Sequence, residues 1–235
     1  DIKAKIETKI NINEKKLKQI IKSNDYDNIL KNKILIKGNF IHNLDLIFDP
    51  TLKVKEYNYL LSAKIEKAIF QFNNPHIASV LNEKISKINI GKTDLKYKQN
   101  STSGQTFLID GLYNINDTKF KKLKSEGLLD KSLSSFNLNF ELDNKIDLPI
   151  LNYSNNDQKI ATIEAEVKLQ KKLLNIIDLT YTEGKNQFYI KNLKANRNLR
   201  LKSFDKIKIK TFEKNLINND FEISFRKNLQ IKGAK

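Results

Sequence analysis

The sequence predicts a mostly β fold built from long antiparallel strands, and three observations support this. Apolar and polar residues alternate with a period of two over much of the chain, which is typical of strands with one dry and one wet face. Segments with helical spacing are short and few. The connections between strand-like runs are polar, and the seven glycines are too dispersed to form tight Asn-Gly turns.

The first two runs carry the clearest alternation. In residues 2–12 every even position is Ile, Ala or Thr, and the odd positions are Lys, Glu or Asn. Residues 34–48 repeat the pattern over a longer distance, and at ~3.3 Å per residue this run would extend roughly 50 Å. Globular strands usually have about five or six residues, so a run of this length is unusual.

The alternation recurs along the rest of the chain, and we expect roughly ten to twelve strands in all. The later runs are 94–98, 107–115, 136–142, 163–169, 188–190, 207–209 and 221–225.

Three segments depart from the alternation. Residues 13–22 have helical spacing behind an N-capping Asn13, and residues 75–82 begin with Pro75, which suits a first helical turn. The sequence therefore predicts short helices near 13–22 and 75–82. Residues 120–132 fit either a loop or a short helix.

Domain organisation follows from the absence of a linker. No segment rich in Pro, Gly or Ser divides the sequence, so we expect residues 1–235 to form a single continuous unit.

The chain contains no Met, starts at Asp1 and ends in a strand-like pattern. We therefore expect it to be an internal segment of a longer protein.

A sheet whose strands are all apolar along one face has to bury that face. An open, twisted groove that holds lipid chains would do so, and so would a closed β-sandwich; composition does not decide between them. The residues that would line a groove share the apolar register of three runs: Ile34, Ile36, Phe40, Leu44, Leu46, Phe48, Phe136, Leu138, Phe140, Leu142, Phe221, Ile223 and Phe225.

Residue types that carry catalysis are sparse. The chain has no Cys, which excludes disulfides, thiolate metal sites and Cys nucleophiles. His42 and His76 are the only histidines and have no partners at zinc or triad spacing, so we expect a core or rim residue and a solvent-facing residue. Carboxylate pairs such as Glu164 and Glu166 have lysines close by and fit surface charge. We expect no enzymatic activity, no cofactor and no metal.

The net charge of +16 and the pI of about 9.7 raise the question of nucleic acid. Among 43 basic residues only Arg197, Arg200 and Arg226 are arginine, the residue best suited to bidentate contacts with phosphate and guanine. Lys, Asn and Ile are the residues that AT-rich codons encode, so we expect much of the charge to reflect genome composition. Specific nucleic-acid binding is disfavoured and stays the weakest alternative.

Two stretches resemble AsmA-like envelope proteins of the YhdP and TamB type. Residues 33–38 (Lys-Ile-Leu-Ile-Lys-Gly) lead into 44–49, and residues 219–225 are followed by Ile231-Lys232-Gly233. In those proteins a short apolar-x-Ile-Lys-Gly strand recurs, followed by a strand that gives its apolar residues to the same face. The similarity in pattern covers essentially the whole chain and includes no catalytic signature.

The resemblance implies a segment of a bridge-like lipid-transfer or envelope-maintenance protein. Such a protein would form a long open β-groove in the periplasm of a Gram-negative bacterium with an AT-rich genome, anchored in the inner membrane by a helix outside this segment. It would guide phospholipid acyl chains toward the outer membrane, with outer-membrane proteins as further partners. The alternative from another class is a structural or adhesin-like β interaction module.

Overall fold

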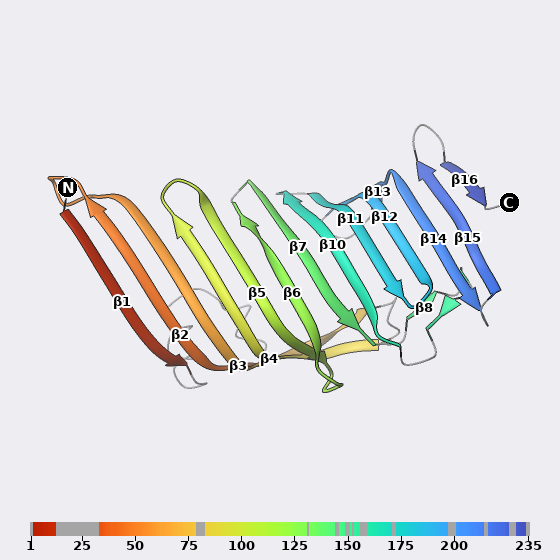
Figure 1. Ribbon diagram of the computed structural model, residues 1–235, viewed down its shortest axis with the longest axis horizontal. Coiled ribbons are helices and arrows are strands. Elements are labelled where there is room, and N and C mark those ends of the chain that lie inside the picture. The colour runs from red at the N-terminus through yellow and green to blue at the C-terminus, as the bar shows by residue number, and fades with distance from the viewer. Residues whose placement is uncertain are drawn as a thin grey trace. The chain divides into compact units, whose positions relative to one another are not determined.

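The computed structural model describes residues 2–12, 33–78, 83–130, 132–143, 146–148, 151, 153–155, 159–170, 173–196, 201–213, 216–225 and 229–233. Sixteen β-strands contain most of these residues. Fourteen of them belong to one open, antiparallel sheet whose strand order follows the chain. The other two, β8 and β9, pair with each other (Figure 1). The prediction of long antiparallel strands in an open sheet is confirmed, and the described residues do not form a closed sandwich.

The chain divides into two compact units, one made of Asp1–Ala78 with Glu83–Leu129 and the other of Asp130–Lys235 with Ser79–Asn82. The strands of the first unit are β1 (Ile2–Ile12), β2 (Lys33–Phe48), β3 (Val54–Ala78), β4 (Glu83–Asn100), β5 (Gly104–Ile115) and β6 (Lys121–Leu129). Those of the second unit are β7 (Leu133–Leu142), β8 (Asp147–Leu148), β9 (Tyr153–Ser154), β10 (Ala161–Gln170), β11 (Leu173–Glu183), β12 (Asn186–Asn196), β13 (Leu201–Ser203), β14 (Lys206–Glu213), β15 (Leu216–Phe225) and β16 (Leu229–Gly233).

In the first unit the strands lie in the order β1-β2-β3-β4-β5-β6. β1 and β2 pair without interruption from Ile2 opposite Phe48 to Ile12 opposite Gly38, which brings the even positions of both strands to the same face. In the second unit the order is β7-β10-β11-β12-β14-β15-β16, and β13 pairs with β12.

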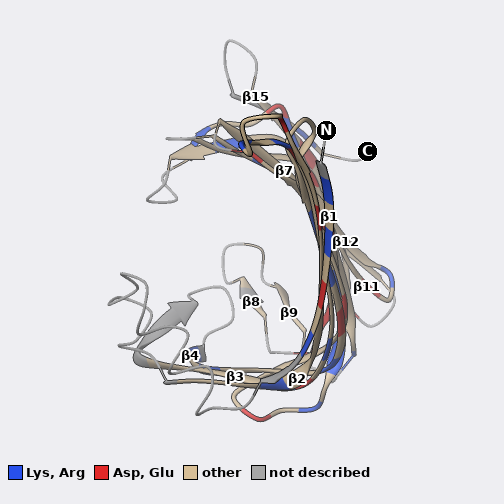
Figure 2. Cartoon of the chain, turned by 90° about the vertical axis from the view of Figure 1, so that its left-hand side faces the viewer, with Lys and Arg blue, Asp and Glu red and all other residues tan. Residues whose placement is uncertain are grey.

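β-Bulges interrupt the longest ladders of the first unit. The pairing of β2 with β3 skips Glu66, and the pairing of β4 with β5 places Lys92 and Thr93 opposite Gly111. A bulge bends its strand and increases the local twist, and the ribbons of β2 and β3 are bent along their length (Figure 2). Gly111 is required here, because a Cβ at this position would lie 2.6 Å from Cα of Thr93.

The predicted helix at 75–82 is wrong in its described part. Residues 75–78 lie in β3, where His76 pairs with Ile85 and Ala78 with Glu83 of the next strand. The pairing skips from Gln71 to His76, so Pro75, which has no N–H to give to a ladder, lies in the interrupted part of the strand. The predicted helix at 13–22 lies outside the described residues.

Residues 120–132 are also not a helix, because β6 occupies 121–129. Its inward positions include Ser125 and Gly127, which are too small to give a hydrophobic period of two. These residues pair with Ile109 and Phe107 of β5, so the small side chains lie opposite large ones. The strand is therefore specified by cross-strand fit with β5 rather than by its own sequence.

Candidate functional site

Most of the large apolar residues of the first unit share one face of its sheet, here called the first apolar face. The antiparallel register aligns them in rows that cross neighbouring strands. These rows are Ile6-Leu44-Tyr59-Gln99-Gln105, Thr8-His42-Leu61-Tyr97-Phe107, Ile10-Phe40-Ala63-Leu95-Ile109, Ile36-Ala68-Ile90-Tyr113 and Ile34-Phe70-Ile88-Ile115.

The two faces of β2 differ in exposure. On the even face Phe40 is only 8% exposed and the other apolar positions are half-buried. On the odd face Lys37, Asn39, Ile41 and Asp45 are exposed, and Leu35, Asn43 and Ile47 are half-buried. The structure thus places the six groove residues proposed on this strand together on the first apolar face: Ile34, Ile36, Phe40, Leu44, Leu46 and Phe48.

Near one end of this face lies a set of hydrogen-bonding side chains, here called the tyrosine patch: His42, Tyr57, Tyr59, Tyr97 and Gln99. Nδ1 of His42 lies 2.6 Å from the hydroxyl of Tyr59. The Tyr97 hydroxyl donates to Oε1 of Gln99 at 2.9 Å, and Nε2 of Gln99 donates to the Tyr57 hydroxyl at 2.8 Å. The Tyr59 and Tyr97 rings meet edge to face, with centroids 6.1 Å apart.

Two hydroxyls of the tyrosine patch stay protonated, and one of its ring nitrogens has no partner among the described residues. Burial, followed by the neighbouring tyrosine, raises the pKa of Tyr59 and of Tyr97, so both hydroxyls keep their protons at neutral pH. Nε2 of His42 is buried and has no hydrogen-bond partner among the described residues. The expectation of a core or rim histidine therefore holds for its position, although only one of its two ring nitrogens is satisfied.

The second unit has its own set of rows, here called the second apolar face. They are Phe140-Ile163-Tyr181-Phe188-Ile209-Phe221, Leu138-Ala165-Leu179-Ile190-Ile207-Ile223-Ile231 and Phe136-Val167-Ile176-Leu193. The proposed groove residues of β7 and β15 thus lie in shared rows, with four strands between them in the sheet, although about 80 positions separate them in the sequence. Phe225 lies at the end of β15, is 41% exposed and packs against the ring of Phe204.

One end of the second apolar face is covered by the chain itself. The described residues 146–148, 151 and 153–155, here called the cap segment, leave the sheet between β7 and β10. Ile146 and Tyr153 are buried against the sheet, in a cluster with Leu142, Ala161 and Tyr181. Leu142 was proposed to line an open groove and is instead 4% exposed within this closed core.

A buried polar network fixes the cap segment. The Tyr153 hydroxyl donates to Oε2 of Glu183 at 2.6 Å and lies 3.0 Å from the Tyr181 hydroxyl. Glu183 is 3% exposed and also accepts from Nδ2 of Asn186 at 2.9 Å. Burial, reinforced by the hydrogen bond to Glu183, raises the pKa of Tyr153. The carboxylate is therefore held by two donors where water is excluded.

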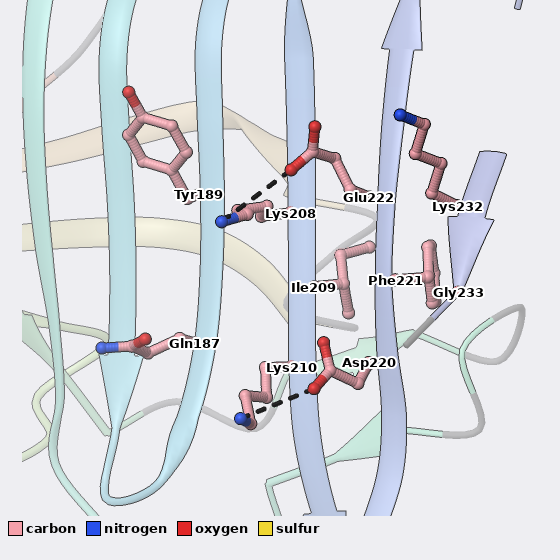
Figure 3. A pocket seen from close by; sticks show the side chains of 10 residues that line it. All are labelled: Gln187, Tyr189, Lys208, Ile209, Lys210, Asp220, Phe221, Glu222, Lys232 and Gly233. Carbon is pink, nitrogen blue, oxygen red and sulfur yellow. Dashed lines mark ion pairs between the residues drawn. The ribbon is translucent and has the colours of Figure 1, made fainter. Parts of the chain in front are cut away.

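The opposite, polar face of the second unit carries a pocket over β12, β14, β15 and β16 (Figure 3). Its acidic residues lie beside lysines of the neighbouring strand: Asp220 is 3.5 Å from Lys210, and Glu222 is 3.8 Å from Lys208. Glu222 also pairs with Lys206 at 3.0 Å, and that hydrogen bond is the largest cause that lowers its pKa. Asp220 and Glu222 offset part of the lysine charge, so this face is not a uniformly basic surface for nucleic acid.

Two strands that contribute to the apolar faces, β3 and β11, were not predicted from the sequence. Both contain a residue that a neighbouring ladder skips, Glu66 in β3 and Ile177 in β11, and each breaks the alternation midway. The run Tyr57, Tyr59, Leu61 and Ala63 was the signal that would have revealed β3.

In the described residues there is no helix of the length and apolarity that crossing a membrane requires. Among the same residues, no group of three or more His, Asp or Glu side chains is arranged to hold a metal ion. Comparison with family models, with curated proteins and with solved structures gives no match.

Proposed function

We propose that this chain binds phospholipid acyl chains on its apolar sheet faces and does so as a non-enzymatic segment of a lipid-transfer or envelope-maintenance protein. The first apolar face is the observation that carries the proposal. Its rows cross five strands, and most of its large side chains are only half-buried.

The physical argument concerns what such a face needs. An apolar surface left in water costs free energy in proportion to its area, about 25 cal/mol per Å². Contiguous apolar patches of this kind mark binding surfaces in soluble proteins. No second sheet or helix covers the first apolar face among the described residues of the first unit. Acyl chains suit it, because they need continuous apolar contact and no directional partner.

The cellular setting of the proposal rests on the resemblance to AsmA-like proteins. We propose a periplasmic location, an inner-membrane anchor outside this segment, and transfer of phospholipid between the inner and outer membranes, with outer-membrane proteins as further partners. The open antiparallel sheet, whose strand order follows the chain, is compatible with this setting because it offers apolar rows running from strand to strand.

The test introduces a charge on one face and then on the other. Leu138 is half-buried on the second apolar face, and its neighbour Asn139 is exposed on the polar face. The chain purified from bacterial membranes in mild detergent should carry phospholipid detectable by native mass spectrometry. Leu138→Asp should reduce that lipid more than about tenfold, because a carboxylate is costly against acyl chains. Leu138→Ala should reduce it less, and Asn139→Asp should leave it unchanged.

Other outcomes favour the other classes of function. Wild-type protein that carries no lipid and unfolds cooperatively would favour the adhesin-like module and contradict our proposal. Tight binding of DNA or RNA near physiological ionic strength, falling steeply with salt, would favour the basic nucleic-acid binder. Equal lipid loss in Leu138→Asp and Asn139→Asp would show that charge alone, and not the apolar face, decides binding.

A further inference from the structure

We infer that the tyrosine patch is the binding site for the ester carbonyl groups of a bound lipid, whose acyl chains extend from it along the first apolar face. The inference rests on the proposed function, since it names the part of the lipid that this face recognises and the orientation in which the lipid lies.

Position is the first argument. Tyr57 and Tyr59 lie near the start of β3, which follows the 49–53 turn, and Gln99 is the penultimate residue of β4, before the 101–103 turn. The tyrosine patch therefore lies at the hairpin end of the face. Beyond it the face becomes apolar, from Leu61 to Phe70 along β3. At ~3.3 Å per residue this stretch is roughly 30 Å long, which exceeds the roughly 15 Å that the acyl chains of one leaflet span.

Hydrogen-bonding capacity is the second argument. The Tyr57 hydroxyl accepts from Gln99, and no described residue accepts the proton of Tyr57. Gln99 donates one of its two amide protons, and the other has no acceptor among the described residues. Each tautomer of His42 leaves one proton of the His42–Tyr59 pair without an acceptor. With the proton on Nε2, the Nε2 proton is unused; with the proton on Nδ1, the Tyr59 hydroxyl proton is unused. The tyrosine patch therefore has three unused donors and needs acceptors.

The absence of charge identifies the class of acceptor. Besides the tyrosine patch itself, the rows through Tyr57, Tyr59 and Tyr97 contain Ala, Ile, Leu, Thr, Gln and Phe and carry no Lys, Arg, Asp or Glu. Neutral donors beside an apolar surface suit neutral carbonyl oxygens, because a phosphate would enter this face without a countercharge. The ester region of a phospholipid combines such carbonyls with acyl chains that continue directly from them. Tyrosine, with an apolar ring and a polar tip, is the residue that fits this boundary.

The test compares two phosphatidylcholines of equal chain length, one with ester-linked and one with ether-linked chains. The ether lipid lacks both carbonyls and keeps the headgroup and the tails. With equimolar mixed vesicles and the full chain, native mass spectrometry should show an excess of bound ester lipid of about three- to tenfold, the selectivity expected from one net hydrogen bond. Replacing phosphatidylcholine by phosphatidylglycerol should leave the bound amount within about twofold, because the tyrosine patch is uncharged.

The double variant Tyr57→Phe/Tyr59→Phe removes two hydroxyls and keeps both rings. It should bind as much total lipid as the wild type and show a smaller ester preference, because the Gln99 amide remains as a donor. Tyr189→Phe, on the polar face of the second unit, should keep the full preference. Equal binding of both lipids by the wild type would overturn this inference and leave the proposed function standing. Binding of neither lipid would overturn the proposed function itself. An ester preference that is undiminished in the double variant would place the carbonyl site elsewhere.

Discussion

The hydroxyl of Tyr153 lies 2.6 Å from Oε2 of Glu183, and this hydrogen bond ties the cap segment to the end of β11. Without it the Glu183 carboxylate would keep the hydrogen bond from the Asn186 amide, in a site that is 3% exposed. The cap segment is thus held by a charge-assisted hydrogen bond as well as by apolar contact, including the Tyr153 and Phe188 rings at 5.1 Å.

Tyr153→Phe should therefore destabilise the second unit. The change keeps the ring packing and leaves the buried carboxylate without its closest donor, so we expect a loss of about 1–3 kcal/mol in the free energy of unfolding. Urea unfolding followed by circular dichroism measures it. Tyr189→Phe is the matched control, because its partner Asp178 lies on the half-exposed polar face and the loss should be smaller. Equal losses in the two variants would argue against a special role for the buried pair.

Gly111→Ala should destabilise the first unit, because the added Cβ would lie 2.5 Å from Cβ of Thr93 and 2.6 Å from its Cα. Backbone atoms cannot move away cheaply, and overpacking of this kind costs about 1–3 kcal/mol. Gly233→Ala serves as the control, since nothing lies within 4 Å of the Cβ it would add. Thermal melting of both variants tests the prediction, and a Gly111→Ala protein as stable as Gly233→Ala would refute the close approach of Thr93.

Deletions at the bulges should show strong coupling. Glu66 and Lys92 lie opposite each other between the pairs Ile65–Thr93 and Lys67–Gly91. Glu66 is an extra residue relative to β2, and Lys92 is an extra residue relative to β5. Deleting either one alone leaves the other without a counterpart and should destabilise the sheet. Deleting both gives regular ladders from β2 to β5, so the double deletion should be more stable than the sum of the single losses predicts, by at least about 1 kcal/mol. Additive losses in urea unfolding would contradict the paired register.

Acid should selectively weaken the contact between β4 and the turn after β5. The hydrogen bond from Lys87, at 2.8 Å, is the largest cause that lowers the pKa of Asp117, and that from Asn89 is the next. A depressed folded-state pKa means that this stabilisation is fully present above the unfolded value of 3.8 and is lost as the pH falls through the folded value. Asp117→Asn should thus be less stable than the wild type at neutral pH.

The difference in stability between the wild type and Asp117→Asn should become smaller below about pH 4. Urea midpoints measured from about pH 7 down to about pH 2.5 follow it. Lys87→Met removes the principal cause of the shift and should produce the same narrowing against the wild type. A difference that stays constant down to the lowest pH would mean that the ion pair is not what distinguishes the two proteins.

The regular strands were predictable because no extra residue shifts the phase of their alternation. In β1, β2 and β7 every apolar residue of one parity falls on one face, and pairing preserves that parity. β3 and β11 were not predicted, since a single extra residue at Glu66 or Ile177 reverses the phase of the pattern, and only the partner strand shows where. The inward Ser and Gly of β6 have the same effect, because their fit depends on Phe107 and Ile109.

The tyrosine patch could not be predicted from sequence spacing. Tyr57 and Gln99 are 42 positions apart, and their hydrogen bond exists because β3 and β4 pair in one register. The apolar face itself was predictable from β2, whereas its polar end depended on residues from three strands. The cap segment could not be predicted either, because its few strand residues are specified by their contacts with the sheet that they cover.

The order of the strands has a consequence for how the molecule folds and comes apart. Almost every ladder joins strands that are consecutive in sequence, and the pairing of β7 with β10, across the cap segment, is the widest departure within a unit. Short loop closures of this kind favour fast zipping from any hairpin, and they make stability a sum of nearest-neighbour terms. Amide hydrogen exchange should accordingly be fastest in β1 and β16 and slow progressively toward the strands flanked on both sides, so that an end strand can detach while the ladder next to it persists.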